Sequence, residues 1–128
     1  INATQTGDAN YSAATDVLQA LTVSQANQTI TFDTLTDKTF GDVPFELTGT
    51  ASSGLTLTYA SSNTAVATVS GTTVTILAAG ATDITATQAG DANYSAATDV
   101  LQALTVSQAD QTITFDTLTG NTIGDVPF

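Results

Sequence analysis

Carboxylates are the only side chains in this sequence that could supply acid–base chemistry or hold a cation. The 128 residues include 12 Asp and Glu, a single cationic side chain (Lys38), and no His or Cys. Without imidazole or thiol groups there is no thiolate nucleophile, no imidazole base and no ordinary zinc site. One cation with a net charge of −11 is also unsuited to a phosphate backbone. The composition therefore excludes most enzyme classes and nucleic-acid binding.

Paired carboxylates are the one catalytic arrangement that this composition leaves open. A retaining glycosidase needs two carboxyl groups about 5 Å apart in a cleft. The Asp residues here stand singly beside turn-forming residues, as in GDAN and FGDVP. Asp in such positions usually accepts hydrogen bonds from nearby backbone amides. We therefore predict that the chain is not an enzyme and has no catalytic residues.

The chain contains a long internal repeat. Residues 1–45 return without a gap as residues 84–128, at a spacing of 83. Six positions differ: Asn2/Thr85, Thr6/Ala89, Asn27/Asp110, Asp37/Gly120, Lys38/Asn121 and Phe40/Ile123. A period of this length is typical of a small domain with its own core rather than of a solenoid turn. Since the sequence has no Met, we expect a mature segment or a fragment of a longer tandem array.

Short segments in which apolar residues alternate with Thr predict the strands. They centre on Ile30 and Phe32, Phe45 and Leu47, Leu55 to Tyr59, Val66 and Val69, Val74 and Ile76, Ile84 and Ala86, and Val100 to Val106. The three-residue spacing of Val66 and Val69 predicts a kink or bulge. Turn-forming residues such as SSG, SGT and GDAN separate these segments. About seven short strands in one repeat indicate an all-β fold, an antiparallel β-sandwich.

The strand order predicts where each repeat begins and ends. Residues 28–110 hold one complete repeat. Residues 1–27 correspond to the C-terminal strands of a preceding repeat, and residues 111–128 to the N-terminal part of the next. The stretch that joins the last strand of one repeat to the first strand of the next contains no Gly or Pro. We therefore expect a semi-rigid array rather than beads on a flexible string.

Several motifs resemble the bacterial immunoglobulin-like tandem repeats of large surface and secreted proteins. They are SSNTAVATVSG, AAGATDITA and GDANY, while TFGDVPF resembles the opening of the related MBG-type repeats. The resemblance covers the whole 83-residue unit. It implies an immunoglobulin-like sandwich, repeated in tandem in an adhesin-like protein that is extracellular or on the bacterial cell surface. It also implies no catalytic residues and no required cofactor.

Calcium at the repeat junctions is the one metal hypothesis that we retain. An extended immunoglobulin-like array would bring Asp42 and Asp83 of one copy toward Asp91 and Asp99 of the next, with Asp110 in the linker. Ca²⁺ prefers several carboxylate and carbonyl oxygens. Two observations oppose a strong site, because no DxDxDG run is present and Asn27 replaces Asp110 in the other copy. The alternative is that these side chains are solvated and only oppose aggregation.

These observations predict a non-enzymatic stalk or spacer repeat of a long extracellular bacterial protein. The first alternative is a self-assembling filament in which neighbouring copies, including those of other fibre chains, complete the terminal segments. A carbohydrate-binding sandwich is less favoured, because there is no Trp and we expect Tyr11, Tyr59 and Tyr94 to be core or loop anchors. The partners that we predict are copies of the same repeat. No apolar run is long enough for membrane insertion.

Overall fold

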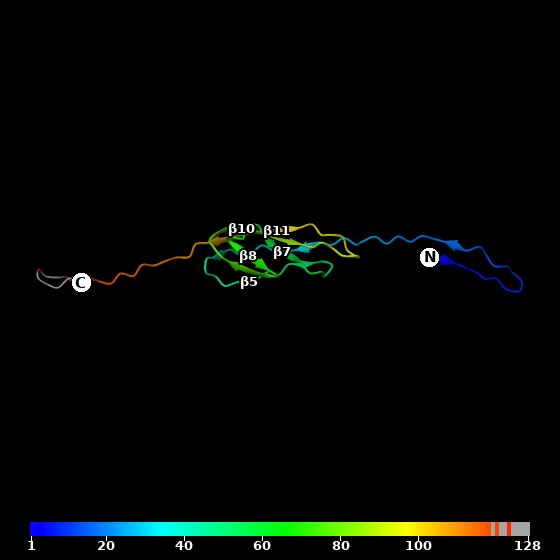
Figure 1. The fold of residues 1–128 in the computed structure, drawn as a ribbon, viewed down its shortest axis with the longest axis horizontal. Coiled ribbons are helices and arrows are strands. Elements are labelled where there is room, and N and C mark those ends of the chain that lie inside the picture. Colours follow the sequence, from blue (N-terminus) through cyan, green and yellow to red (C-terminus); the bar gives the residue numbers. More distant parts are fainter. Residues whose placement is uncertain (119, 121–122, 124–128) are drawn as a thin grey trace.

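The computed structural model describes residues 1–118, 120 and 123 as an elongated molecule with a β-rich body at its centre (Figure 1). A thin N-terminal hairpin extends from one end of the body and the C-terminal segment extends from the other. The described residues form strands and no helix. This confirms the predicted all-β class, and the body has a sandwich-like architecture. Residues 119, 121–122 and 124–128 of the predicted partial repeat, including Asn121, lie outside the described residues.

Residues 28–110, all described, contain nine strands rather than about seven. They are β3 (Ile30–Thr31), β4 (Lys38–Thr39), β5 (Phe45–Glu46), β6 (Thr50–Ala51), β7 (Thr58–Ser61), β8 (Ala67–Ser70), β9 (Thr73–Ile76), β10 (Gly80–Thr87) and β11 (Val100–Ser107). Two of them, β4 and β6, occupy stretches for which no strand was predicted. Both are only two residues long, which is too short to produce a visible alternation of side chains.

The largest sheet has the order β4-β11-β10-β7. Strands β10 and β11 form a long antiparallel pair, from Gly80 opposite Val106 to Ala86 opposite Val100. Strand β7 pairs antiparallel with β10, whereas β4 pairs parallel with the end of β11. The sheet is therefore mixed, and the prediction of purely antiparallel pairing was wrong for β4. The exception is two residues long, with Lys38 opposite Val106.

Two smaller sheets complete the body. One has the order β5-β9-β8 and the other pairs β3 with β6, all antiparallel. At the predicted kink, the amides of Leu77 and Ala78 both donate to the carbonyl oxygen of Val66, at 2.8 and 3.2 Å. Two successive amides sharing one carbonyl is the geometry of a bulge. Val66 directly precedes β8 and Leu77 directly follows β9, so the extra residue lies on the segment after β9 rather than in the Val66 segment where the kink was predicted.

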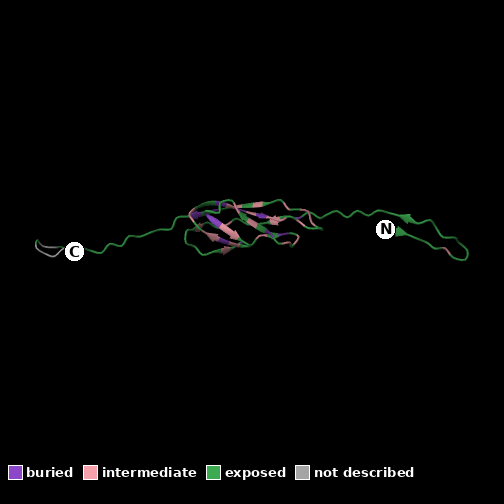
Figure 2. Ribbon diagram, in the orientation of Figure 1, coloured by how far each residue is buried: buried purple, intermediate pink, exposed green. Residues whose placement is uncertain are grey.

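The core lies between the sheets and draws on all of them (Figure 2). Alternate residues of the two long strands point inward, so Ile84 and Leu104 are fully buried. Val74 from the three-stranded sheet is also fully buried, and the Phe32 ring packs on Tyr59 with centroids 5.4 Å apart. The buried hydrophobic side chains are Phe32, Leu47, Ala51, Leu57, Val66, Ala67, Val74, Ile84, Ala86, Leu104 and Val106. All of them fall within the predicted complete repeat.

The N-terminal hairpin repeats the register of the long hairpin without its core. Strands β1 (Asn2–Ala3) and β2 (Val17–Leu18) place Asn2 opposite Leu18. The equivalent positions 83 residues later, Thr85 and Leu101, are also opposite one another. Leu21 and Val23 are exposed, whereas their equivalents Leu104 and Val106 are buried. Ile113 and Phe115 are likewise exposed, at 95% and 80%. Both terminal segments therefore carry apolar side chains that a complete repeat buries.

A substitution at Gly80 tests the packing at the start of β10. Gly80 has a φ of +150°, and a Cβ added there would lie 2.8 Å from Cγ2 of the buried Val66. We expect Gly80→Ala to reduce the free energy of unfolding by about 2–4 kcal/mol through backbone strain and overpacking. Gly54→Ala is the matched control, because Gly54 has a φ of +78° but nothing within 4 Å. Strain alone should cost about 1 kcal/mol there. Equal losses in urea unfolding would show that the Val66 contact is unimportant.

Candidate functional site: the junction between repeats

The strongest candidate site is the place where the linker between repeats, residues 25–28, meets a loop of the following repeat. We call residues 88–97, which form most of the connection between β10 and β11, the junction loop. The Ala26 amide donates to the Asn93 carbonyl at 2.7 Å, and the Ser95 amide donates to the Ala26 carbonyl at 2.9 Å. Ala26 and Tyr94 thus form a short parallel bridge. The linker and the tip of this loop lie side by side at the end of the body that faces the N-terminal hairpin (Figure 1).

Glutamine and serine side chains add a second set of hydrogen bonds. Gln25 Nε2 donates to the Asp91 carbonyl at 2.6 Å, and Ser95 Oγ donates to Asn27 Oδ1 at 3.1 Å. Gln28 is buried, with 6% of its side chain exposed. Its Nε2 donates to the Ser95 carbonyl at 2.7 Å, while its Oε1 accepts from Ser53 Oγ. Gln28 therefore ties the linker to the body and to the junction loop at once.

The junction loop holds its own shape through Asp91. One carboxylate oxygen of Asp91 accepts from the amides of Asn93 and Tyr94, at 2.7 and 2.8 Å. Gly90 takes a φ of +78°, and its amide donates to Gln88 Oε1 at 2.6 Å. The equivalent loop of the N-terminal hairpin has the same bonds, from Asn10 and Tyr11 to Asp8 Oδ1 and from Gly7 to Gln5 Oε1. The loop forms without a packed body behind it, so its shape is a local property of QxGDANY.

The five aspartates proposed for calcium are distributed over the body. Asp42 Oδ2 accepts from the Thr39 amide at 2.9 Å. Asp91 caps the junction loop, and Asp99 lines a separate small pocket beside the same hairpin. Asp110 lines a pocket at the opposite end of the body. Asp83 was expected in a loop at the pole, but it lies within β10 opposite Ala103.

Within residues 1–118, 120 and 123, no three acidic side chains come close enough to hold a metal ion. The proposed site needs carboxylates from two adjoining complete copies, and this chain contains only one complete copy. At the junction that it does contain, Asn27 stands where the other copy has Asp110. Calcium binding between two complete copies therefore stays a prediction.

Glu46 is held by two hydroxyl groups. Thr72 Oγ1 and Thr73 Oγ1 each donate to its carboxylate at 2.6 Å. The bond from Thr72, followed by that from Thr73, lowers the pKa of Glu46 below its usual value. The carboxylate thus joins β5 to the turn between β8 and β9 and to the first residue of β9.

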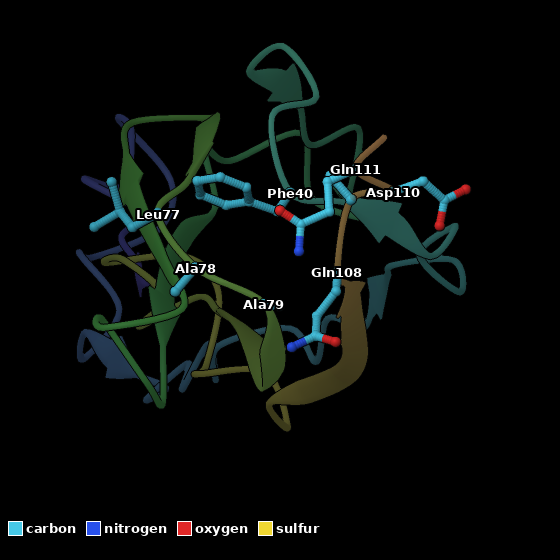
Figure 3. Close-up of a pocket in the computed structure, with 8 residues that line it drawn as sticks. Phe40, Leu77, Ala78, Ala79, Gln108, Asp110 and Gln111 are labelled. Atoms are coloured by element: carbon cyan, nitrogen blue, oxygen red, sulfur yellow. The ribbon is translucent and has the colours of Figure 1, made fainter. Parts of the chain in front are cut away.

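An apolar pocket lies at the other end of the body, where β11 ends. We call this end the C-terminal pole. The pocket has a volume of about 640 Å³ and is lined by Phe40, Leu77, Ala78, Ala79, Gln108, Ala109, Asp110 and Gln111. Residues 77–79 lie on one side of it, and Gln108, Asp110 and Gln111 lie on the other (Figure 3). Half of the Phe40 and Leu77 surface is exposed, at 50% and 49%. Residues 108–111 are the equivalents of the docked linker, residues 25–28.

Comparisons with known proteins found no match, so a functional proposal has to rest on the geometry described above. No protein-family model matches the chain, and no curated protein or solved structure is significantly similar to it. Among the described residues, no helix is long and apolar enough to cross a membrane.

The docking of the linker was not predicted from the sequence. The sequence did show that the linker lacks Gly and Pro, and it showed two Gln residues, Gln25 and Gln28, that return as Gln108 and Gln111. Their partners are mostly backbone carbonyls about 66 residues away along the chain, and every residue carries a carbonyl. The available signal was therefore polar side chains at fixed positions in a linker, without any indication of what they bind.

Gln28 and Gln111 provide a matched test of the junction. Gln28→Ala removes two buried hydrogen bonds, so we expect the free energy of unfolding to fall by about 1–3 kcal/mol. Gln111→Ala makes the same change in the same local sequence, but Gln111 is exposed, and its effect should be within about 0.5 kcal/mol. Urea unfolding of both variants checks this. Equal effects would show that linker docking does not stabilise the body.

Glu46 gives an expected pH dependence. A lowered carboxyl pKa stabilises the folded state above the unfolded pKa, and this stabilisation is lost as pH falls through the folded pKa. We therefore expect the difference in melting temperature between the native chain and Glu46→Gln to shrink as pH falls below the ordinary glutamate value. A difference that stays constant from pH 7 to pH 3 would contradict the role of the two threonine hydroxyls.

Proposed function

We propose that the chain belongs to a non-enzymatic structural repeat, a stalk or spacer of a long extracellular bacterial fibrous or adhesin-like protein. The observation that carries this proposal is the docked linker. Residues 25–28 follow the last strand of one repeat and are hydrogen-bonded to the junction loop of the next. In the complete repeat the last strand, β11, runs to Ser107, the equivalent of Ser24, so the linker follows that strand directly. An array built on this junction keeps its repeats in fixed orientations.

The stiffness follows from the kind of bonds involved. A Gly/Ser linker is flexible because its backbone is free to rotate. Here Ala26 uses both its amide and its carbonyl in hydrogen bonds to the junction loop. The buried Gln28 side chain donates to the Ser95 carbonyl and so restricts rotation of the backbone at the end of the linker. Rotation at the linker would break several hydrogen bonds together, so bending is opposed at every junction.

The immunoglobulin-like assignment is part of this proposal. It is supported by the motif resemblance, by the all-β body and by a core built from several sheets. The strand order β4-β11-β10-β7 puts the first part of the repeat beside the last strand. This pairing ties the beginning of the repeat to its end and suits a domain through which force passes along the long axis.

The acidic residues support a structural role rather than a reactive one. Asp42 and Asp91 accept hydrogen bonds from backbone amides, and Glu46 accepts from two threonine hydroxyls. Each of these three carboxylates is engaged in shaping a turn or joining strands. A net charge of −11 with this arrangement keeps parallel rods apart in solution.

Assembly into a filament of many chains is the second candidate function. The exposed apolar residues of the terminal segments favour it: Leu21 and Val23 at one end, Ile113 and Phe115 at the other. Their equivalents are buried or half-buried in the complete repeat. The terminal segments together have no counterpart of residues 46–83, so they cannot complete one domain between two chains. Continuation within one polypeptide is for this reason the favoured arrangement.

Arrays of one, two and four complete copies test the stalk proposal. We expect the maximum dimension in small-angle X-ray scattering to grow linearly with copy number, by about 40 Å per copy for strands of this length plus loops. A flexible string would instead lengthen with about the square root of copy number, and that result would overturn the proposal. Open-ended growth of the 128-residue chain with concentration, measured by light scattering, would favour the filament.

A further inference from the structure

We infer that the apolar pocket at the C-terminal pole binds the junction loop of the following copy. Consecutive repeats would then contact one another through their bodies as well as through the linker. The occupant is a second copy of this repeat, presenting the equivalents of residues 90–95. This inference rests on the proposed tandem array and adds a specific interface to it.

The first argument is continuity with the junction that the structure contains. Four of the eight residues that line the pocket are residues 108–111. Their equivalents, residues 25–28, are hydrogen-bonded to the junction loop at the other end of the body. The only difference is Asn27 against Asp110, and both carry the Oδ1 acceptor that Ser95 uses. The junction loop of the next copy should therefore bind residues 108–111 in the same way, beside this pocket.

The second argument is how short the path is from the body to that loop. Ser107 is the last residue of β11, and its carbonyl accepts from the Phe40 amide at 2.8 Å. Gln108 follows directly, and its equivalent Gln25 reaches the Asp91 carbonyl of the loop at 2.6 Å. Contact with the junction loop of the next copy should therefore begin at Gln108. This residue directly follows Ser107, to which the Phe40 amide donates, and it lines the pocket.

The third argument is the chemistry of the two surfaces. One wall of the pocket is apolar and consists of Phe40, Leu77, Ala78 and Ala79. About half of the surface of Phe40 and of Leu77 is exposed to water. Position 40 is Ile123 in the other copy, so it is apolar in both. The tip of the junction loop presents the exposed, uncharged Ala92 and Asn93. Covering apolar surface contributes about 25 cal/mol for each Å² removed from water.

The experiment uses the chain followed by a second copy of residues 46–110. Since residues 111–128 duplicate residues 28–45, this addition supplies one whole further repeat. We expect the NMR methyl signals of Leu77, Ala78 and Ala79 in the first copy to shift relative to the 128-residue chain. The Leu101 methyl signals, on exposed β11 surface remote from the pocket, should not move. Shifts at residues 108–111 with unchanged pocket methyl signals would overturn the inference.

A cross-linking experiment gives a second readout that does not depend on assigning signals. The chain has no Cys, so Leu77→Cys in the first copy and Ala92→Cys in the second form the only thiol pair. We expect an intramolecular disulfide under mild oxidation, because docking would bring their Cβ atoms within reach. Leu101→Cys paired with the same Ala92→Cys is the matched control and should stay reduced. Cross-links only between chains, or equal yields for the two pairs, would overturn the inference.

Failure of this inference can be distinguished from failure of the stalk proposal. If the pocket methyl signals do not shift while scattering still shows linear growth, the linker alone keeps the array straight. If growth is not linear, the tandem-stalk proposal itself is wrong. The methyl signals are measured on the two-copy chain, and the growth is measured on the arrays of one, two and four copies.

Discussion

The antiparallel pairing of β10 with β11 is the interaction on which the rest of the molecule depends. It spans seven residue pairs, from Gly80 with Val106 to Ala86 with Val100. One face of this pair supplies four of the buried core residues, Ile84, Ala86, Leu104 and Val106. Its loop receives the linker of the preceding repeat, and its final residues pair with β4. One hairpin therefore organises the core, the entry of the chain and its exit.

A constraint follows from using one hairpin for both folding and connection. The hairpin and its loop can form alone, as residues 1–19 show, but then their apolar face is uncovered. Only residues 46–83, together with the first strands, provide the opposing layers. Isolated hairpins are at best marginally stable in water. Each repeat consequently needs its middle segment for a core, and each junction needs the loop of the next repeat.

Much of the fold could be predicted from local patterns. Alternation at Val100 to Val106 identified the inward face of β11. The spacing of Val66 and Val69 indicated an irregularity near Val66, but the extra residue lies on the facing segment, at Leu77 and Ala78. The two-residue strands β4 and β6 left no pattern to read. The position of Asp83 was wrong because the small residues before it, AAGAT, suggested a turn, whereas β10 already begins at Gly80. Sheet pairing over long distances in sequence overrode the local signal.

The candidate junction was only half visible in the sequence. The repeat itself, the absence of Gly and Pro in the linker and the GDANY turn could all be read directly. The partners could not, because Ala26 binds through its backbone and a backbone group has no sequence identity. The same applies to the pocket, whose walls come from segments about 30 to 40 residues apart, at Phe40, Leu77 and Gln108.

The sequence by itself determined the β class, the 83-residue period and the shape of the junction loop, which occurs twice with the same hydrogen bonds. These properties depend on residues close together in the chain. The tertiary structure alone decided which copy of an identical segment is buried. Leu21 and Leu104 occupy the same local sequence, yet one is 70% exposed and the other fully buried. The physical reason is that burial requires opposing layers, and only the second copy has residues 46–83 to provide them.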